Sequence, residues 1–254
     1  MWDVVNECGL YRLKGHKGPI TSLSFDKERN VLVSSSKDTL IKFWDLNVQH
    51  CFKTLTEHIM EVWDFVLVKG YIITGTSDAE LRVFKLQYSE SADSNFGNSI
   101  EPHMKKLKVL DDADDENQDA DDEQDEFDAG ILKIERVGSL LRQGQDKVAH
   151  LVVDSEERLI ACHGSNDSTV EIFAICSEDE VKKRLQKRAK KERRKNGSAS
   201  ANSEANTDLP NPTIQEEFRR LKVFKGPGKI RHLQVSFRKD IAEILIGKSQ
   251  KYFY

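Results

Sequence analysis

Long apolar runs are missing from this 254-residue chain. No stretch approaches the roughly 18 consecutive apolar residues that a membrane-spanning helix requires, and the N-terminus lacks the basic-then-apolar pattern of a secretory signal. The chain is instead rich in charge, with 32% charged and 38% hydrophobic residues. We therefore expect an intracellular, soluble protein with no membrane partner, in which part of the chain does not pack into a core.

Cysteine is scarce and poorly spaced for ligand or disulfide chemistry. The four cysteines lie far apart and form no C-x-x-C pair, which argues against a zinc site and against a disulfide scaffold. We expect free thiols in a reducing compartment at all four positions, Cys8, Cys51, Cys162 and Cys176.

Common catalytic signatures are also absent. The sequence contains no G-x-S-x-G, no glycine-rich phosphate loop followed by Lys-Ser or Lys-Thr, and no H-E-x-x-H. We therefore expect a protein that is not an enzyme and that takes no cofactor, metal ion or small-molecule substrate.

What the sequence does contain is a repeat anchored on four short runs of similar pattern. Val62 in EVWDFVLV follows Ile20 in PITSLSF by 42 residues, within the roughly 40 to 45 residues of a four-stranded propeller blade. Val148 in KVAHLVV and Ile230 in KIRHLQV follow after a further 86 and 82 residues. Each of these longer steps equals one period plus an insert of similar size.

The same events follow each anchor: a short apolar run, a turn, and a strand that closes on an aromatic residue. An acidic residue favours such tight turns, and in three of the four units an aspartate stands six residues before the aromatic. Four such units predict an all-β fold of consecutive four-stranded sheets, which bury their faces by stacking on one another. The turn residues are Asp38, Asp78, Asp167 and, in the fourth unit, Lys248; the aromatics are Trp44, Phe84, Phe173 and Tyr254.

The unit from Gly15-His16 to Trp44-Asp45 resembles the WD-repeat family. The resemblance implies β-propeller blades, four repeats of a larger seven-bladed propeller or of tandem propellers. A seven-bladed ring would need about three more units, so we expect this chain to be a fragment or a truncated product.

In the WD-repeat family a histidine, a strand serine or threonine, the turn aspartate and the tryptophan form a buried hydrogen-bonded set. The resemblance places this set on two units of the chain, the second of which has a phenylalanine in place of tryptophan. A catalytic role for these residues is the weaker alternative, since buried polar groups in a blade need to satisfy one another. The matching residues are His16, Ser34, Asp38 and Trp44, then His58, Thr74 and Asp78.

The repeats and the interruptions divide the chain into five segments. We predict two WD-repeat units in 1–86, an acidic disordered insert in 87–129, a degenerate unit in 130–176, a basic helical insert and linker in 177–217, and a degenerate, truncated unit in 218–254. Both inserts would leave from the loop between the third and fourth strands of a blade, which would place them side by side on one face.

The acidic insert carries twelve carboxylates in the eighteen residues from Asp111 to Asp128. With almost no apolar side chains it cannot offset the entropy of ordering by burial, so we expect it to be disordered, with a solubilising or a binding role. It lacks the glycine and the spaced glutamate of an EF-hand loop, which disfavours a calcium site.

The basic insert reads SEDEVKKRLQKRAKKERRKNG and predicts a helix, because acidic residues open it and Asn196-Gly197 closes it. Val181, Leu185 and Ala189 form a narrow apolar stripe for contact with a partner or with the propeller. The ten basic residues favour phosphate contact or nuclear import, with an ordinary solvated charged helix as the alternative. These candidates are Lys182, Lys183, Arg184, Lys187, Arg188, Lys190, Lys191, Arg193, Arg194 and Lys195.

Three segments together, SSSKDTLIKFWDLNVQHCFKTLTEH, LIACHGSNDSTVEIFAI and the basic helix that follows, resemble the Utp-twelve (Dip-two) type of WD-repeat protein of the small-subunit processome. The resemblance implies a scaffold within the U-three small nucleolar RNA particle, acting in the nucleolus in 18S ribosomal RNA processing and ribosome biogenesis. It implies other WD-repeat processome proteins, U-three RNA and pre-ribosomal RNA as partners. The alternative is a generic WD-repeat adaptor that presents peptide partners to a ubiquitin ligase or signalling complex and binds them without the basic helix or RNA.

Overall fold

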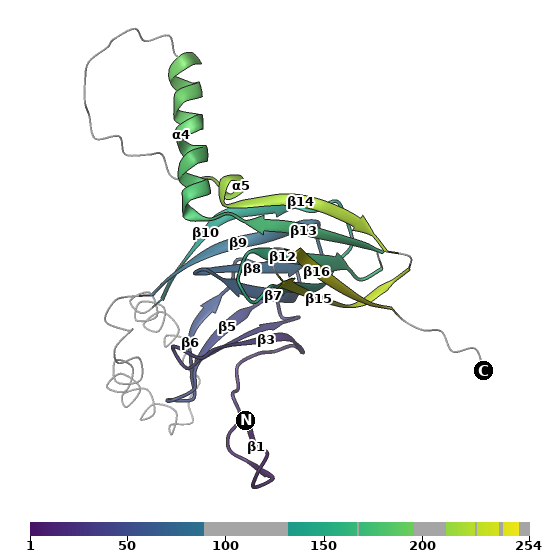
Figure 1. Cartoon of the computed structure of the whole chain (residues 1–254). Helices are drawn as coiled ribbons and strands as arrows, with labels where there is room; N and C mark the ends of the chain where they lie inside the picture. Colours follow the sequence, from purple (N-terminus) through teal and green to yellow (C-terminus); the bar gives the residue numbers. More distant parts are fainter. Residues whose placement is uncertain (89–131, 167, 196–211, 227, 239–240, 249–254) are drawn as a thin grey trace, which may run out of the picture. The chain divides into compact units, whose positions relative to one another are not determined.

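The computed structural model describes residues 1–88, 132–166, 168–195, 212–226, 228–238 and 241–248 (Figure 1). Strands dominate this part of the chain, with two helices, α4 (Glu178–Lys195) and α5 (Ile214–Glu217). The strands are β1 (Trp2–Asp3), β2 (Cys8–Gly9), β3 (Ile20–Asp26), β4 (Val31–Ser36), β5 (Ile41–Asp45), β6 (His50–Leu55), β7 (Val62–Val68), β8 (Tyr71–Thr76), β9 (Glu80–Tyr88), β10 (Leu132–Leu141), β11 (Val148–Val153), β12 (Leu159–Gly164), β13 (Thr169–Ile175), β14 (Phe218–Lys225), β15 (Ile230–Arg238) and β16 (Ile241–Lys248).

Three of the sheets are four-stranded, and each is built from strands consecutive in sequence. Their orders are β3-β4-β5-β6, β10-β9-β8-β7 and β11-β12-β13-β14, while β15-β16 and β1-β2 form two-stranded sheets. Sheets of four consecutive strands are the blades of a propeller. The predicted fold class, all-β with WD-repeat β-propeller blades, is confirmed.

The four anchors of the repeat occupy one and the same structural position. Ile20, Val62, Val148 and Ile230 are the first residues of β3, β7, β11 and β15. In each case the register with the next strand shifts directly after the anchor, which marks a β-bulge. The repeat found in the sequence is therefore a repeat of backbone geometry as well.

Each insert lies between the third strand of a sheet and the outer strand that completes the same sheet. β10 completes the second four-stranded sheet beside β9, and β14 completes the third beside β13. The segment boundaries predicted at 130 and 218 group β10 and β14 with the unit that follows each of them. In the structure, each of these strands belongs to the sheet that precedes its insert. The acidic run from Asp111 to Asp128 lies outside the described residues, and so does the predicted side-by-side placement of the two inserts.

The chain divides into two compact units, with the division passing through the ends of β9 and β10. In the first unit, a core of buried side chains joins the sheets of β3 and β7: Val31, Val33, Ile41, Phe43, Phe52, Leu55, Val62, Phe65, Ile72, Phe84 and Leu132. The hydroxyl of Thr21 on β3 donates to the carbonyl of Val62 on β7, 2.7 Å away, which ties the two innermost strands together.

In the second unit the core lies between the β11–β14 sheet and β15-β16. It is formed by Leu159, Ala161, Val170, Ile172, Ile230, Leu233 and Val235. Every residue of β12 is buried, which explains why LIACHG does not alternate between apolar and polar residues and has His163 as its one polar side chain.

Candidate functional site

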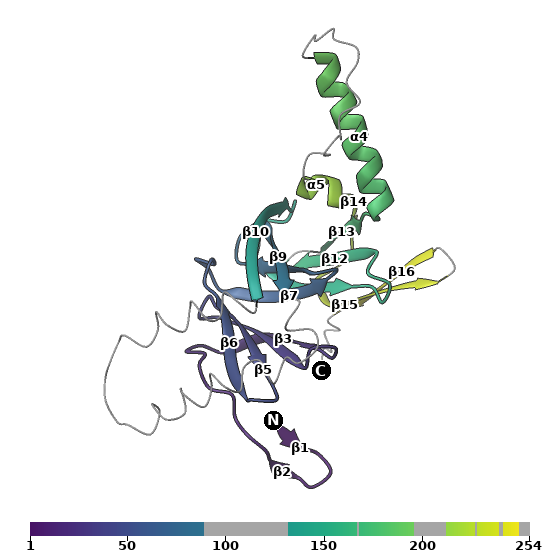
Figure 2. The same ribbon diagram turned by 90° about the vertical axis from the view of Figure 1, so that its left-hand side faces the viewer.

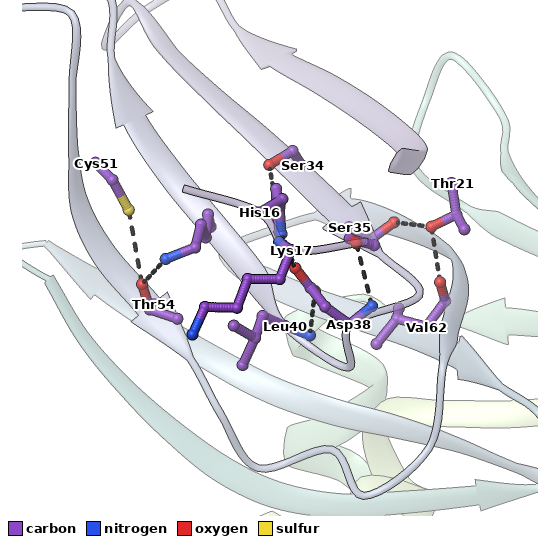
Figure 3. Close-up of polar contacts among 12 residues, drawn as sticks. His16, Lys17, Thr21, Ser34, Ser35, Asp38, Leu40, Cys51, Thr54 and Val62 are labelled. Atoms are coloured by element: carbon purple, nitrogen blue, oxygen red, sulfur yellow. Dashed lines mark hydrogen bonds and ion pairs between the residues drawn. The ribbon is translucent and has the colours of Figure 1, made fainter. Parts of the chain in front are cut away.

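Near the first sheet, polar side chains link the segment before β3 to β4 and to the turn that precedes β5 (Figure 3), and Trp44 extends the set to β5. The Nδ1 atom of His16 lies 2.8 Å from Oδ2 of Asp38, and its Nε2 atom lies 2.8 Å from the Ser34 oxygen. The indole Nε1 of Trp44 donates to the same Ser34 oxygen at 2.8 Å. The structure thus brings all four predicted residues of this unit together.

With His16 in one neutral tautomer, every bond of this set has a donor and an acceptor. An indole can only donate, so the Ser34 oxygen accepts from Trp44 and its own proton is available for Nε2 of His16. The neutral His16 tautomer with its proton on Nδ1 then donates to Asp38. Ser34 is 2% exposed and its oxygen is already shared, so it is not placed to attack a substrate despite the Ser-His-Asp arrangement.

The Asp38 carboxylate also closes the turn before β5. It accepts from the amides of Lys17 and Leu40, at 2.8 and 3.1 Å. Burial raises the pKa of Asp38, but the bond from His16 and those from these two amides outweigh burial and hold the pKa below its usual value of 3.8. The folded state therefore favours the charged carboxylate.

This lowered pKa predicts a pH dependence of stability. A carboxyl group with a depressed folded pKa contributes stability that is full above its unfolded pKa and is lost as the pH falls through the folded pKa. We expect the difference in free energy of unfolding between the wild type and Asp38→Asn to be constant from pH 7 to about 5, and to shrink below pH 3.8. Urea titrations at a series of pH values would measure it.

Taking the difference between the wild type and Asp38→Asn cancels the contribution of Asp45, a second carboxyl group, whose pKa is shifted in the opposite direction. Burial raises the pKa of Asp45, against hydrogen bonds from Asn47 and Val48. Its protonation on acidification favours the folded state, but it does so in both proteins. A difference between wild type and Asp38→Asn that stayed flat to about pH 3 would contradict the assignment to Asp38.

The second sheet keeps part of the same arrangement. Nε2 of His58 lies 2.9 Å from the Thr74 hydroxyl, as His16 lies beside Ser34. The Asp78 carboxylate accepts from Thr76 at 2.7 Å. Phe84 cannot donate a hydrogen bond and instead packs its ring against His58, with centroids 5.3 Å apart.

The third sheet replaces the set with a buried ion pair that was not predicted from the sequence. The Nε atom of Arg142 lies 3.9 Å from the Glu171 carboxylate, and the two side chains are 1% and 2% exposed. Glu171 also accepts from the amides of Gln143 and Gly144, at 2.9 and 3.0 Å. A signal for it was present, since a glutamate interrupts the apolar strand TVEIFAI.

Cys162 stands in the third sheet where Ser34 and Thr74 stand in the first two, opposite Leu151 in the register. Burial raises the pKa of this thiol to about 12, with Arg142 and Glu171 acting in opposite directions. The thiol is therefore neutral and unreactive at physiological pH. Asp167 and Tyr254 lie outside the described residues, as does the side chain of Lys248.

The basic helix α4 belongs to the second unit and starts as predicted at Glu178 (Figures 1 and 2). Ser177 caps it: its oxygen accepts from the Glu180 amide at 3.4 Å, and the Glu180 carboxylate accepts from the Ser177 amide at 3.2 Å. This reciprocal pair is a capping box. The amide of Cys176 donates to the Glu217 carbonyl at 2.8 Å, so the two ends of the insert meet beside β13 and β14.

One face of α4 contacts its own protein. Leu185 is 5% exposed, and Val181 and Ala189 are partly buried beside it. Arg184 donates to the Glu216 carbonyl of α5 at 3.0 Å, and Arg188 forms an ion pair with the Glu216 carboxylate at 2.8 Å. The predicted stripe is therefore buried or partly buried, and two of the ten predicted phosphate contacts, Arg184 and Arg188, bind α5.

The opposite face of α4 carries a row of exposed lysines. These are Lys182, Lys183, Lys187, Lys190 and Lys191, which we call the lysine face. The side chains of Arg193, Arg194 and Lys195 lie outside the described residues. Among the described side chains of α4, Arg184 and Arg188 dock on α5, whereas the five lysines of the lysine face are exposed.

No described helix has the length and apolar character to cross a membrane. Within the described ranges, no three side chains among His, Cys, Asp and Glu are grouped so as to hold a metal ion. All four cysteines are free thiols.

Comparisons with known proteins agree with the blade architecture. A family model described as "WD domain, G-beta repeat" matches residues 8–45. WD repeat-containing protein 3 of Mus musculus is 43% identical over 136 residues, covering 52% of this chain, and that of Homo sapiens is 41% identical over 106 residues, covering 40%. Mitochondrial division protein 1 of Pyricularia oryzae is 29% identical over 106 residues, covering 42% of this chain and 15% of that protein.

The matches cover only a small part of these relatives, 14% of the mouse protein and 11% of the human one. Among solved structures, the computationally designed Ika8 protein matches 91% of this chain and 43% of its own, at 15% identity and a TM-score of 0.46, a likeness too low to inform function. The chain therefore contains a WD40 repeat and shares homology, over part of its length, with WD repeat-containing protein 3.

Proposed function

We propose that this chain is a non-enzymatic scaffold in small-subunit ribosomal RNA processing, in which WD-repeat blades hold a basic helix against RNA. The observation that carries the proposal is the division of α4 into a docked arginine face and an exposed lysine face. A helix that served only as a solvated spacer would need no such anchoring.

The lysine face suits contact with a phosphate backbone. Its five ammonium groups lie on successive turns of one side of a rigid helix, and each can displace a counterion from RNA. The face has no aromatic side chain, so it would bind without base stacking or sequence preference. Charge alone would supply affinity, and neighbouring surfaces would supply any selectivity.

The particular assembly comes from the resemblance to the Utp-twelve type and from the homology with WD repeat-containing protein 3. On this proposal the chain acts in the nucleolus, with U-three RNA, pre-ribosomal RNA and other WD-repeat processome proteins as partners. The alternative, a peptide-presenting adaptor for a ubiquitin ligase or signalling complex, uses the blades and leaves the lysine face without a role.

Neutralising the lysine face tests the RNA contact. We expect Lys→Gln at Lys182, Lys183, Lys187, Lys190 and Lys191 to weaken binding of single-stranded RNA and to flatten the salt dependence, by about 0.7 in the logarithmic slope for each phosphate that is no longer neutralised. Fluorescence anisotropy between about 50 and about 200 mM salt would measure both. The melting temperature should stay the same, because these side chains are exposed.

The matched control changes the same number of exposed lysines elsewhere, at Lys14, Lys27, Lys69, Lys85 and Lys133. Equal loss of affinity in the two variants would mean that RNA binding depends only on net charge, and it would contradict a specific role for α4.

A tagged pull-down from nuclear extract, with and without ribonuclease, separates the two functions. Recovery of U-three RNA with processome WD-repeat proteins supports the scaffold, and ligase partners that are still recovered after ribonuclease treatment support the adaptor.

A further inference from the structure

The second unit contains an open pocket of about 570 Å³ at the start of its two innermost strands, β11 and β15. Its volume is in the range of roughly 300 to 1,000 Å³ typical of small-ligand sites. The described residues that line it include three basic side chains and three histidines, while the Asp146 carboxylate lies beside the lining. These basic side chains and histidines are Lys147, Lys229, Arg231, His150, His163 and His232.

The residues that line the pocket differ from those at the equivalent repeat positions of the first unit. After the bulge in β3, Ser22 pairs with Ser35, and Thr21 beside them bonds both Ser35 and the Val62 carbonyl of the adjacent inner strand. After the same bulge in β11, the corresponding pair is His150 with His163.

At the position of the bridging Thr21, β11 has Ala149 and β15 has Arg231. At the position of Ser22, β15 has a histidine, His232, as β11 does. Ala149 cannot make the bond to the next inner strand that Thr21 makes. His232 pairs with Gly247, where a Cβ atom would lie 3.1 Å from that of His232. At the positions where the first blade has small side chains, the third and fourth units thus carry imidazoles that line an opening.

The three histidine rings lie close together, His150 edge-on to His163 and tilted against His232. The ring centroid of His150 lies 6.3 Å from that of His163 and 6.0 Å from that of His232, with an interplanar angle of 37° in the second pair. His232 is exposed, so the outer face of its ring is open to solvent. Histidine rings are among the side chains on which unpaired RNA bases stack.

The loop after β12 holds one of the cations, Lys229, and contacts the backbone of another, Lys147. The Lys229 ammonium donates to the Asn166 side-chain oxygen at 3.0 Å, and the amide of Ser165 donates to the Lys147 carbonyl at 3.0 Å. The nearby Asp146 carboxylate accepts from the Asn166 amide at 2.8 Å and so fixes the loop that carries this asparagine. The side chains that line the pocket itself therefore give it a positive charge.

We propose that this pocket binds one nucleotide of single-stranded RNA, its phosphate held by Lys147, Lys229 and Arg231 and its base stacked on His232. The inference deepens the proposed RNA role, on which it rests, and assigns a second contact separate from the lysine face. An acidic peptide would complement the positive charge of the lining, but it would leave the exposed imidazole of His232 without a function. The observations therefore favour a nucleotide.

The test uses the whole chain and three probes: a fluorescein-labelled oligouridine RNA, adenosine 5′-monophosphate and inorganic phosphate. We expect Lys147→Gln/Lys229→Gln/Arg231→Gln to weaken RNA binding and to lower the logarithmic salt slope by about 0.7 for each phosphate that is no longer neutralised. The control Lys27→Gln/Lys85→Gln/Lys133→Gln makes the same change in net charge at exposed sites and should bind nearly as the wild type does.

The stacking contact is tested separately. Since one stacked base contributes roughly 5- to 150-fold in affinity, His232→Ala should weaken RNA binding by a factor in that range and leave the melting temperature unchanged. Gln234→Ala, an exposed change on the same strand, should have no effect. Adenosine monophosphate should compete better than inorganic phosphate.

The outcomes separate this inference from the proposed function. If RNA binding depends on the lysine face but is unchanged in both pocket variants, the proposed nucleotide site is wrong and the scaffold role is unaffected. No RNA binding by the wild type overturns both. Equal competition by phosphate and the monophosphate, or binding of a peptide with the sequence of Asp111–Asp128 in place of RNA, overturns the assignment to a nucleotide.

Discussion

Replacing Glu171 with alanine should lower the free energy of unfolding of the second unit by about 3 to 5 kcal/mol, the typical cost of removing one partner from a buried ion pair. The Arg142 guanidinium would stay inside the unit with its side chain 1% exposed and no carboxylate beside it. The amides of Gln143 and Gly144 would lose their acceptor as well. Urea unfolding followed by far-ultraviolet circular dichroism would measure the change.

Two further variants establish the cause of that loss. Glu171→Gln keeps an oxygen for the two amides and removes only the charge, so it should cost less than Glu171→Ala. Arg142→Met combined with Glu171→Met removes both charges and should recover part of the stability, because a buried pair can be replaced by apolar side chains of similar volume. If the double variant is no more stable than Glu171→Ala, the unpaired buried charge is not the reason for the loss.

Replacing Asp38 with alanine should cost the first unit about 1 to 3 kcal/mol, because three donors, two of them partly buried, would lose their acceptor. These donors are Nδ1 of His16 and the amides of Lys17 and Leu40. Since all three tryptophans, Trp2, Trp44 and Trp63, lie in the first unit, their fluorescence during urea unfolding reports on this unit.

An exposed aspartate with similar local bonds provides the control for Asp38. Asp3 accepts from the amides of Val5 and Asn6, at 2.9 and 3.1 Å, but these groups are open to water. Asp3→Ala should therefore have a much smaller effect on unfolding. Equal losses in the two variants would mean that the turn bonds matter and the buried set around His16 does not.

The sequence by itself determined the blade frame, because backbone repetition leaves a trace in side-chain pattern. The anchors Ile20, Val62, Val148 and Ile230 could be found from the spacing of similar runs, since each begins the first strand of a unit. The bounds of α4 could be predicted too, because acidic residues at its start and an Asn-Gly at its end are local signals. The inserts followed from the two long steps between anchors.

Only the tertiary structure decided how charges are used, because the value of a charge depends on what surrounds it. The ten basic residues of α4 look alike in sequence, yet Arg184 and Arg188 reach α5 while the lysine face points outward. Arg142 and Glu171 lie 29 residues apart and become a pair only when β13 folds beside its neighbours. The histidines His150 and His232 come from different strands, 82 residues apart in the sequence, and only the packing of one sheet on the next places their rings together.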